Sequence, residues 1–161
     1  MRNLIFLSVF LISISGFTQK TLPDISLKTF EGEKVSVTDL TLNGKTAIIS
    51  LWATWCVPCI KELDAINELY DEWKEEVDFE VYAISVDDSR SIKRAKALVN
   101  GKGWEHKILL DTNQNLKRAL GAAAIPETII VKNNKILYQH TGYRNGDEYE
   151  LFEILKKVSK E

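Results

Sequence analysis

The sequence has little of what metal sites and disulfide-rich scaffolds are built from. Among its 161 residues there are only 2 Cys and 2 His, so a four-ligand structural metal site would have to use every one of them. A framework of several disulfide bonds is impossible with one pair of cysteines. Any sulfur chemistry in this protein therefore depends on that single pair.

Neither sign of charge is in surplus. The chain has 21 Lys and Arg against 23 Asp and Glu, which gives a formal net charge of -2. Proteins that bind nucleic acids neutralise phosphates with an excess of basic side chains, so we expect no nucleic acid among the partners. Repeats and low-complexity segments are absent from the sequence, and its content of 45% hydrophobic and 27% charged residues is typical of one globular domain.

The chain also lacks an apolar run that matches the thickness of a bilayer. The run Leu4–Ile14 covers 11 residues, against the roughly 20 that a membrane-spanning helix needs. It follows the charged Arg2 and precedes the small residues Ser15 and Gly16, which is the layout of a secretory signal peptide. We therefore predict that residues 1–18 are a signal peptide.

Cleavage before Gln19 would leave residues 19–161 as the mature domain, and a cut after Ser15 is a second possibility. Retention of the leader as an N-terminal membrane anchor is the alternative to cleavage. In either case we expect export to the periplasm, where thiols tend to be oxidised. A cysteine pair in that compartment is either a structural bridge or a redox centre.

The apolar patterns of the mature chain alternate between strands and helices. Strands are predicted at 27–30, 34–37, 45–53, 80–86, 107–110, 127–131 and 136–141. Helices are predicted at 57–75, at 89–101, from Thr112, and at the C-terminus, where the inner face carries Tyr149, Phe152, Leu155 and Val158 or their neighbours. The first two and the last two strands form hairpins, and the strand, helix and strand between 45 and 86 form a parallel βαβ unit. These patterns predict an α/β domain whose mixed central sheet is flanked by helices.

The two cysteines lie in the motif Cys56-Val57-Pro58-Cys59, where the strand 45–53 meets the helix 57–75. Residues three apart on a helix lie about 5–6 Å from each other, close to the Cα separation of a disulfide. Cys56 would lie at the helix N-terminus, where free N–H groups favour a thiolate. We therefore predict that Cys56 is the attacking thiol and that the more buried Cys59 resolves the mixed disulfide.

Two other interpretations of the cysteine pair compete with redox chemistry. A structural bridge would close a very small loop, and the entropic stabilisation by a disulfide grows with loop length. A zinc half-site would need two more ligands, and His106 and His140 lie 34 residues apart without the usual short spacing. Redox chemistry is therefore the favoured interpretation.

The segment Trp52–Cys59, together with Ile125-Pro126-Glu127-Thr128 further on, resembles the thioredoxin-like family. Within it the likeness is to the exported thiol–disulfide oxidoreductases of the TlpA, ResA and DsbE (CcmG) group, and it extends from about Leu22 to the C-terminus. The resemblance implies a thioredoxin-like fold with an N-terminal β-hairpin. It also implies that the helix and strand between Ser89 and Leu110 are the insertion of that group.

The resemblance assigns roles to further residues. Pro126 is expected to be a cis-proline that lies against the disulfide, with the backbone of Ile125 facing an extended substrate peptide. Glu62 matches an acidic residue one turn after the second cysteine, and Glu127 matches the acid of a Pro-Glu-Thr variant, so both are expected to be catalytic. The expected substrate-binding residues are Trp55, Pro58, Ile125 and Pro126.

One position departs from the pattern of small thioredoxins. Their buried Asp six residues before the first cysteine is replaced here by Ser50, which cannot titrate. Proton exchange with Cys59 must then come from another group. Glu62 is the first candidate.

The function expected is that of a periplasmic thiol–disulfide oxidoreductase that reduces protein disulfides. Its partners would be protein disulfide substrates and a membrane thiol–disulfide electron donor, and we expect a monomer without a cofactor or metal. A peroxiredoxin-like peroxidase is one alternative, although its Pro and Thr positions hold Ile49 and Ala53. A copper-binding module that uses Cys56, Cys59 and His140 is another.

Overall fold

The structure is a computed structural model in which residues 20–160 are described. The predicted signal peptide, residues 1–18, lies outside the described residues. The strands are β1 Ser26–Lys28, β2 Lys34–Ser36, β3 Thr46–Trp52, β4 Phe79–Ser85, β5 Lys107–Leu110, β6 Glu127–Lys132 and β7 Lys135–Thr141. The helices are η1 Val37–Gly44, which is a 3-10 helix, α1 Val57–Glu68, α2 Tyr70–Glu76, α3 Ile92–Lys102, α4 Asn115–Leu120 and α5 Asp147–Ser159.

All strands join one 7-stranded sheet in the order β2-β1-β5-β4-β3-β6-β7. Strands β3, β4 and β5 run parallel, while β1, β2, β6 and β7 pair with their neighbours antiparallel. The mixed sheet, the two hairpins and the βαβ unit are thus confirmed. Strand β3 lies inside the sheet, and all seven of its residues are buried, as its unbroken apolar run indicates.

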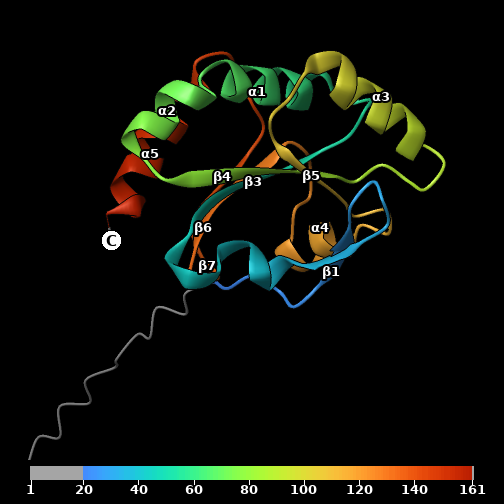
Figure 1. The fold of residues 1–161 in the computed structure, drawn as a ribbon, viewed down its shortest axis with the longest axis horizontal. Helices are drawn as coiled ribbons and strands as arrows, with labels where there is room; N and C mark the ends of the chain where they lie inside the picture. The colour runs from blue at the N-terminus through green and yellow to red at the C-terminus, as the bar shows by residue number, and fades with distance from the viewer. Residues whose placement is uncertain (1–19, 161) are drawn as a thin grey trace, which may run out of the picture.

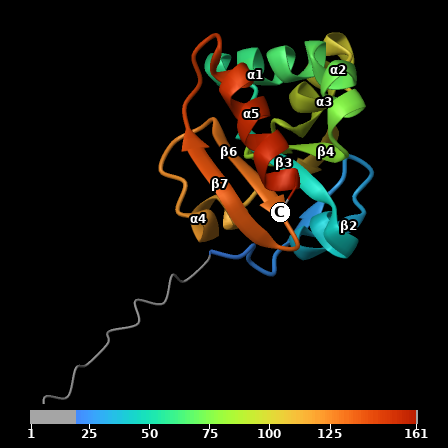
Figure 2. The same cartoon turned by 90° about the vertical axis from the view of Figure 1, so that its left-hand side faces the viewer.

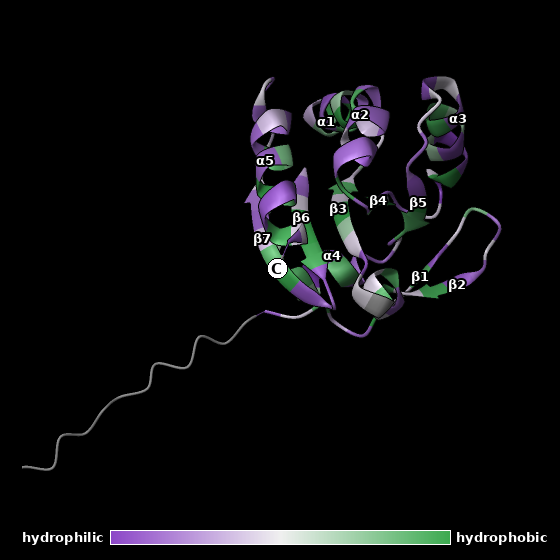
Figure 3. Cartoon of the chain, turned by 60° about the vertical axis from the view of Figure 1, so that its left-hand side comes forward, coloured by the Kyte–Doolittle hydropathy of each residue, from purple (hydrophilic) through white to green (hydrophobic). Residues whose placement is uncertain are grey.

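Helices cover both faces of the sheet (Figures 1 and 2). On one face lie α1, α2, α3 and α5, and on the other lie α4 and η1. Because side chains alternate along a strand, Ile48 of β3 packs into the cluster with Phe152 of α5, whereas Ile49 packs into the cluster with Leu120 of α4. Figure 3 shows the hydrophobic colouring concentrated on the strands and on the helix sides that face them.

The segment that leads into the domain adds to the edge of the sheet. The Ile136 N–H donates to the Lys20 carbonyl at 2.8 Å, and the Leu22 N–H donates to the Asn134 carbonyl at 2.8 Å. Between them Thr21 forms an isolated antiparallel bridge with Lys135. Residues 20–22 therefore lie along β7, a pairing that the sequence did not predict.

The helix predicted over 57–75 is two helices in the structure. At Leu69 the backbone leaves the helical region, with φ -101° and ψ 1°. The buried side chains Ile66 and Trp73 lie on either side of this break and pack into one cluster. An apolar periodicity that continues across a single non-helical residue does not reveal the break.

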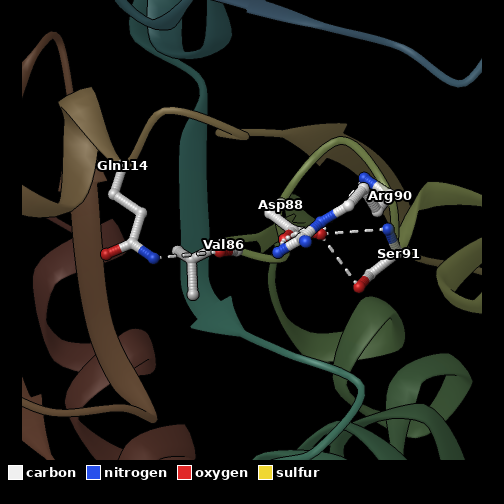
Figure 4. A network of polar contacts seen from close by, with 5 residues as sticks. All are labelled: Val86, Asp88, Arg90, Ser91 and Gln114. Carbon is white, nitrogen blue, oxygen red and sulfur yellow. Dashed lines mark hydrogen bonds and ion pairs between the residues drawn. The ribbon is translucent and has the colours of Figure 1, made fainter.

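Other expectations need correction. The helix predicted from Thr112 begins at Asn115, because Gln114 just before it has a left-handed backbone with φ 54°. The helix predicted from Ser89 begins at Ile92, because the Asp88 carboxylate accepts hydrogen bonds from the N–H groups of Arg90 and Ser91 and holds these residues in a turn (Figure 4). In α5 Phe152, Leu155 and Val158 face inward as expected, but Tyr149 does not, since its side chain is 62% exposed. Its neighbours Glu148 and Leu151 are buried instead.

Candidate active site

The cysteine pair lies where β3 passes into α1. Cys56 immediately precedes the first residue of α1, and a disulfide bond joins it to Cys59 with a Cα–Cα distance of 5.3 Å. The Cys59 N–H donates to the Cys56 sulfur at 3.3 Å. Pro58 lies in the first turn of the helix, where its missing N–H costs no hydrogen bond. Cys56 thus lies at the N-terminus of α1, where the free N–H groups of the helix favour a thiolate.

The surroundings of the two sulfurs differ. Cys59 is fully buried, and Cys56 is 4% exposed. The residues on either side of Cys56 face solvent, since Trp55 is 66% exposed and Val57 is 62% exposed. A partner protein can therefore approach Cys56 over apolar side chains, whereas Cys59 is covered.

The loop before β6 contributes the second part of the site. The Ile125–Pro126 peptide bond is cis, as expected from the resemblance. Pro126 is buried, and Ile125 is half-buried against the same hydrophobic cluster that contains Cys56 and Cys59. The loop and the start of α1 thus share one apolar cluster.

Glu62 is a buried carboxyl group on α1. It is 4% exposed, and its two oxygens accept hydrogen bonds from the hydroxyls of Ser50 and Thr128, each at 2.8 Å. Burial raises the pKa of Glu62 to about 7, although the hydrogen bonds from Thr128 and Ser50 oppose the shift. Ser50, which cannot titrate, is therefore part of the site as a donor to the group that can.

A cavity of about 50 Å³ adjoins Glu62 on the side of β7 and α5. Thr128, His140, Tyr143 and Glu148 are among the residues that line it. The Tyr143 hydroxyl donates to the Glu148 carboxylate at 2.7 Å. A water molecule needs a cavity of at least roughly 10–15 Å³ and polar partners, so water has room beside the buried Glu62 carboxyl.

Glu127 does not join Glu62. It is the first residue of β6, and Thr128 is the second, so the two side chains point to opposite faces of the sheet. The Glu127 carboxylate accepts hydrogen bonds from Gln139 and from Thr141 on the neighbouring strand. The Gln139 amide oxygen in turn accepts from the Lys20 ammonium at 3.1 Å. Glu62 and Glu127, which were both expected to be catalytic, therefore lie on opposite faces of the sheet.

The histidines do not complete a metal site. His106 is buried, and its Nε2 lies 3.0 Å from the Leu63 carbonyl oxygen. His140 lies opposite Thr128 in the pairing of β6 with β7. Within residues 20–160, no group of three or more His, Cys, Asp or Glu side chains is arranged to hold a metal ion. The ligand sets considered for zinc and for copper are not assembled.

Sequence reasoning missed Asp87, a buried residue just after β4. Its carboxylate accepts hydrogen bonds from the backbone N–H and from the hydroxyl of Thr54, both at 2.9 Å. Thr54 lies two residues before Cys56, so Asp87 contacts the loop that carries the redox pair. Nothing in the sequence distinguishes this Asp from the half-buried Asp88 beside it.

A redox-active pair at the start of a helix, beside a cis-proline loop in a mixed sheet, defines a thioredoxin-fold protein that exchanges disulfides. The model of the AhpC/TSA family matches residues 18–140. The chain is 30% identical over 141 residues to the thiol-disulfide oxidoreductase ResA of Bacillus thuringiensis, a match that covers 87% of this chain and 78% of ResA.

Solved structures agree with this class. A thioredoxin-like protein of Porphyromonas gingivalis is 43% identical with a TM-score of 0.76, covering 86% of this chain and 92% of that one. A putative thiol:disulfide interchange protein DsbE of Chlorobium tepidum is 25% identical with a TM-score of 0.76, covering 88% and 96%.

The chain belongs to the AhpC/TSA family of thioredoxin-like proteins, and within that family its relatives include the ResA oxidoreductases. The protein is accordingly a thiol–disulfide oxidoreductase. No helix of the described part of the chain, residues 20–160, is both long and apolar enough to cross a membrane.

Proposed function

We propose that this protein reduces disulfide bonds of other exported proteins in the periplasm, and that a membrane thiol–disulfide electron donor restores its dithiol. The observation that carries the proposal is the disulfide-bonded pair at the start of α1, with one accessible flank and a buried carboxyl group one turn further on. Cys56, Cys59 and Glu62 are the residues to which we assign the chemistry.

The reaction starts from the dithiol form. The Cys56 thiolate attacks one sulfur of the substrate disulfide, which releases the other substrate sulfur as a thiolate and forms a mixed disulfide. Cys59 loses its proton and attacks the Cys56 sulfur, which releases the second substrate thiol and closes the Cys56–Cys59 bond. The substrate gains two electrons and two protons, and the protein loses the same number.

We assign to Glu62 the role of accepting the proton that Cys59 loses before it attacks. A buried carboxyl whose pKa lies at about 7 exchanges protons readily at neutral pH. The cavity beside it gives water room at this carboxyl, and Trp55, Pro58 and Ile125 are not among its lining residues. Glu127 lies on the opposite face of β6, where its carboxylate accepts hydrogen bonds from Gln139 and Thr141 of β7, so we assign it no part in this proton transfer.

The substrate-binding surface is formed by the side chains around Cys56. Trp55 and Pro58 are exposed, and Ile125 is half-buried before the cis-proline Pro126. These residues are apolar, which suits an extended protein segment whose own cysteine has been exposed. We assign Trp55, Pro58, Ile125 and Pro126 to this contact.

We propose the reducing direction because the groups available to stabilise a Cys56 thiolate are few, namely the N–H groups at the start of α1. Within residues 20–160 the Cys59 N–H is the one hydrogen-bond donor to the Cys56 sulfur, and no Lys, Arg or His side chain contributes. Strong oxidants of this fold owe their potential to a well-stabilised thiolate. A weakly stabilised thiolate favours the oxidised protein and thus makes the dithiol a reductant.

We predict a reduction potential near the roughly -270 mV of reducing members of the fold, far from the roughly -120 mV of strong oxidants. The measurement equilibrates the domain with dithiothreitol or glutathione buffers and counts free thiols after an acid quench. The double variant Cys56→Ser/Cys59→Ser gives the background. A potential on the oxidising side of the glutathione couple would contradict the reductase assignment.

Export is a separate prediction, based on Arg2 and the apolar run Leu4–Ile14. Mass spectrometry of the protein from the periplasmic fraction should show a new N-terminus between Gly16 and Gln19. The same protein in the membrane fraction with an intact leader would indicate an anchored form instead. An intact Met1 in a cytosolic pool would contradict export in both forms.

A further inference from the structure

Asp87 is a buried carboxylate that is bound to the loop before the cysteine pair. It is 4% exposed, and its oxygens accept three hydrogen bonds at 2.9 Å, two from Thr54 and one from the Ser85 hydroxyl. Within residues 20–160 it forms no ion pair with Lys, Arg or His. A buried carboxylate without a cation depends on such hydrogen bonds, and two of the three come from one residue.

The loop that Asp87 holds is short. It begins after Trp52, whose carbonyl accepts from the Val86 N–H at 2.8 Å, and it ends where the Cys56 N–H donates to the Ala53 carbonyl at 3.0 Å. Between these two hydrogen bonds, Thr54 is bound to Asp87 through both its backbone and its side chain. Asp87 therefore ties the middle of the loop to the end of β4.

The two cysteines are fixed in different ways. Cys59 is inside α1, whereas Cys56 is the residue just before it: the Cys56 carbonyl accepts from the Ile60 N–H of the helix at 3.2 Å, and the Cys56 N–H donates to Ala53 of the loop. The exposed side chain of Trp55 offers the loop little packing. The hydrogen bonds of Thr54 to Asp87 thus fix Cys56 from the side of the loop, while its hydrogen bonds with the N–H groups of Ile60 and Cys59 fix it from the side of α1.

We propose that Asp87 is a positioning residue of the redox pair, which favours the disulfide over the dithiol by holding Cys56 within reach of Cys59. The inference rests on the proposed function, in which these two sulfurs are the redox centre. Closing a bond between two groups is favoured by every contact that holds them together beforehand. Release of Thr54 lowers the effective concentration of one thiol at the other, so it weakens the disulfide.

The test measures an equilibrium between two forms of the same variant. The protein disulfide and two glutathione molecules give the protein dithiol and one glutathione disulfide, and free thiols are counted at several buffer ratios. A loss of stability common to both forms cancels in this equilibrium constant. For Asp87→Ala we expect the constant for reduction to rise about fivefold, the equivalent of one net hydrogen bond.

Two variants serve as controls. Asp87→Asn keeps an oxygen for the Thr54 N–H and places an amide opposite the Thr54 hydroxyl, so its constant should stay within about twofold of the wild type. Asp88→Ala removes the neighbouring carboxylate, which accepts hydrogen bonds from Arg90 and Ser91 in the turn before α3 (Figure 4). Its constant should also be unchanged.

If Asp87→Ala does not fold, Thr54→Val and Thr54→Ser decide the matter. Valine removes the hydroxyl contact with Asp87 and should raise the constant about twofold to threefold, whereas serine should restore it. A wild-type constant in every Asp87 and Thr54 variant overturns the inference, as does an equal shift in Asp87→Asn and Asp87→Ala. A wild-type pair that does not exchange with glutathione at all contradicts the proposed function instead.

Discussion

Cys59→Ser is expected to accumulate covalent complexes with other exported proteins, each joined through Cys56, while Cys56→Ser accumulates few or none. In the structure Cys59 is fully buried, and Cys56 lies beside the exposed Trp55 and Val57. A substrate disulfide can therefore reach Cys56 but not Cys59. The asymmetry between the two variants is the signature of an attacking and a resolving thiol.

The size of the effect follows from how the mixed disulfide is released. Cys59 attacks from three residues away in the same helical turn, and intramolecular groups act at effective concentrations far above those of free thiols. Without the Cys59 sulfur, release depends on external thiols and should slow by about a hundredfold or more. Non-reducing gels of the exported fraction should show the complexes as bands that disappear on reduction.

Two controls complete this experiment. The double variant Cys56→Ser/Cys59→Ser should trap nothing, and circular dichroism should show that every variant retains the fold. Mass spectrometry of the bands identifies the substrates, including any membrane electron donor. Equal trapping by the two single variants would contradict the assignment of the thiols, and consumption of hydrogen peroxide at the rate of substrate reduction would favour the peroxidase alternative.

The parts of the fold that the sequence predicts are those with a local signal. The apolar run of β3 and the CxxC motif each occupy a few consecutive positions, so each can be recognised from the local sequence. The break at Leu69 and the pairing of Thr21 with Lys135 have no such signal. The first is one residue long, and the second joins residues that are far apart in the chain.

The same limit applies to the site. Glu62 can be singled out from its place one turn after Cys59, but its donors Ser50 and Thr128 lie on two different strands. The separation of Glu127 from Glu62 depends on the register of β6, where a shift by one residue would exchange the two faces. The donors to Glu62 and its separation from Glu127 are thus set by the tertiary structure and cannot be recognised from the motif.

Glu62 is expected to make the folded protein less stable as the pH rises from about 5 to 8. An unfolded Glu has a pKa of about 4.3, whereas in the folded protein burial raises the pKa of Glu62 to about 7. Between these values the folded state keeps a proton that the unfolded state has lost. The stability from this group is complete below the lower value and is lost as the pH passes the upper one, a change of about 3 kcal/mol.

Glu62→Gln should remove this pH dependence. The amide is neutral at every pH, and it can still form hydrogen bonds with the hydroxyls of Ser50 and Thr128. Urea titrations of the disulfide form at pH 5 and pH 8 measure the free energy of unfolding, and the difference between the variant and the wild type isolates Glu62. His106, whose pKa is lowered by burial, contributes an opposite slope that is present in both proteins and cancels.

The same variant tests the assignment of the proton. If Glu62 takes the proton of Cys59, Glu62→Gln should slow the resolution of mixed disulfides by about tenfold to a hundredfold near neutral pH, within the range of general acid–base catalysis. Glu68→Gln makes the same change at an exposed position of α1 and should alter neither property. A variant with lost pH dependence of stability but an unchanged rate of resolution would leave Glu62 as a buried acid without a catalytic role, and Cys59 would then have to lose its proton to water.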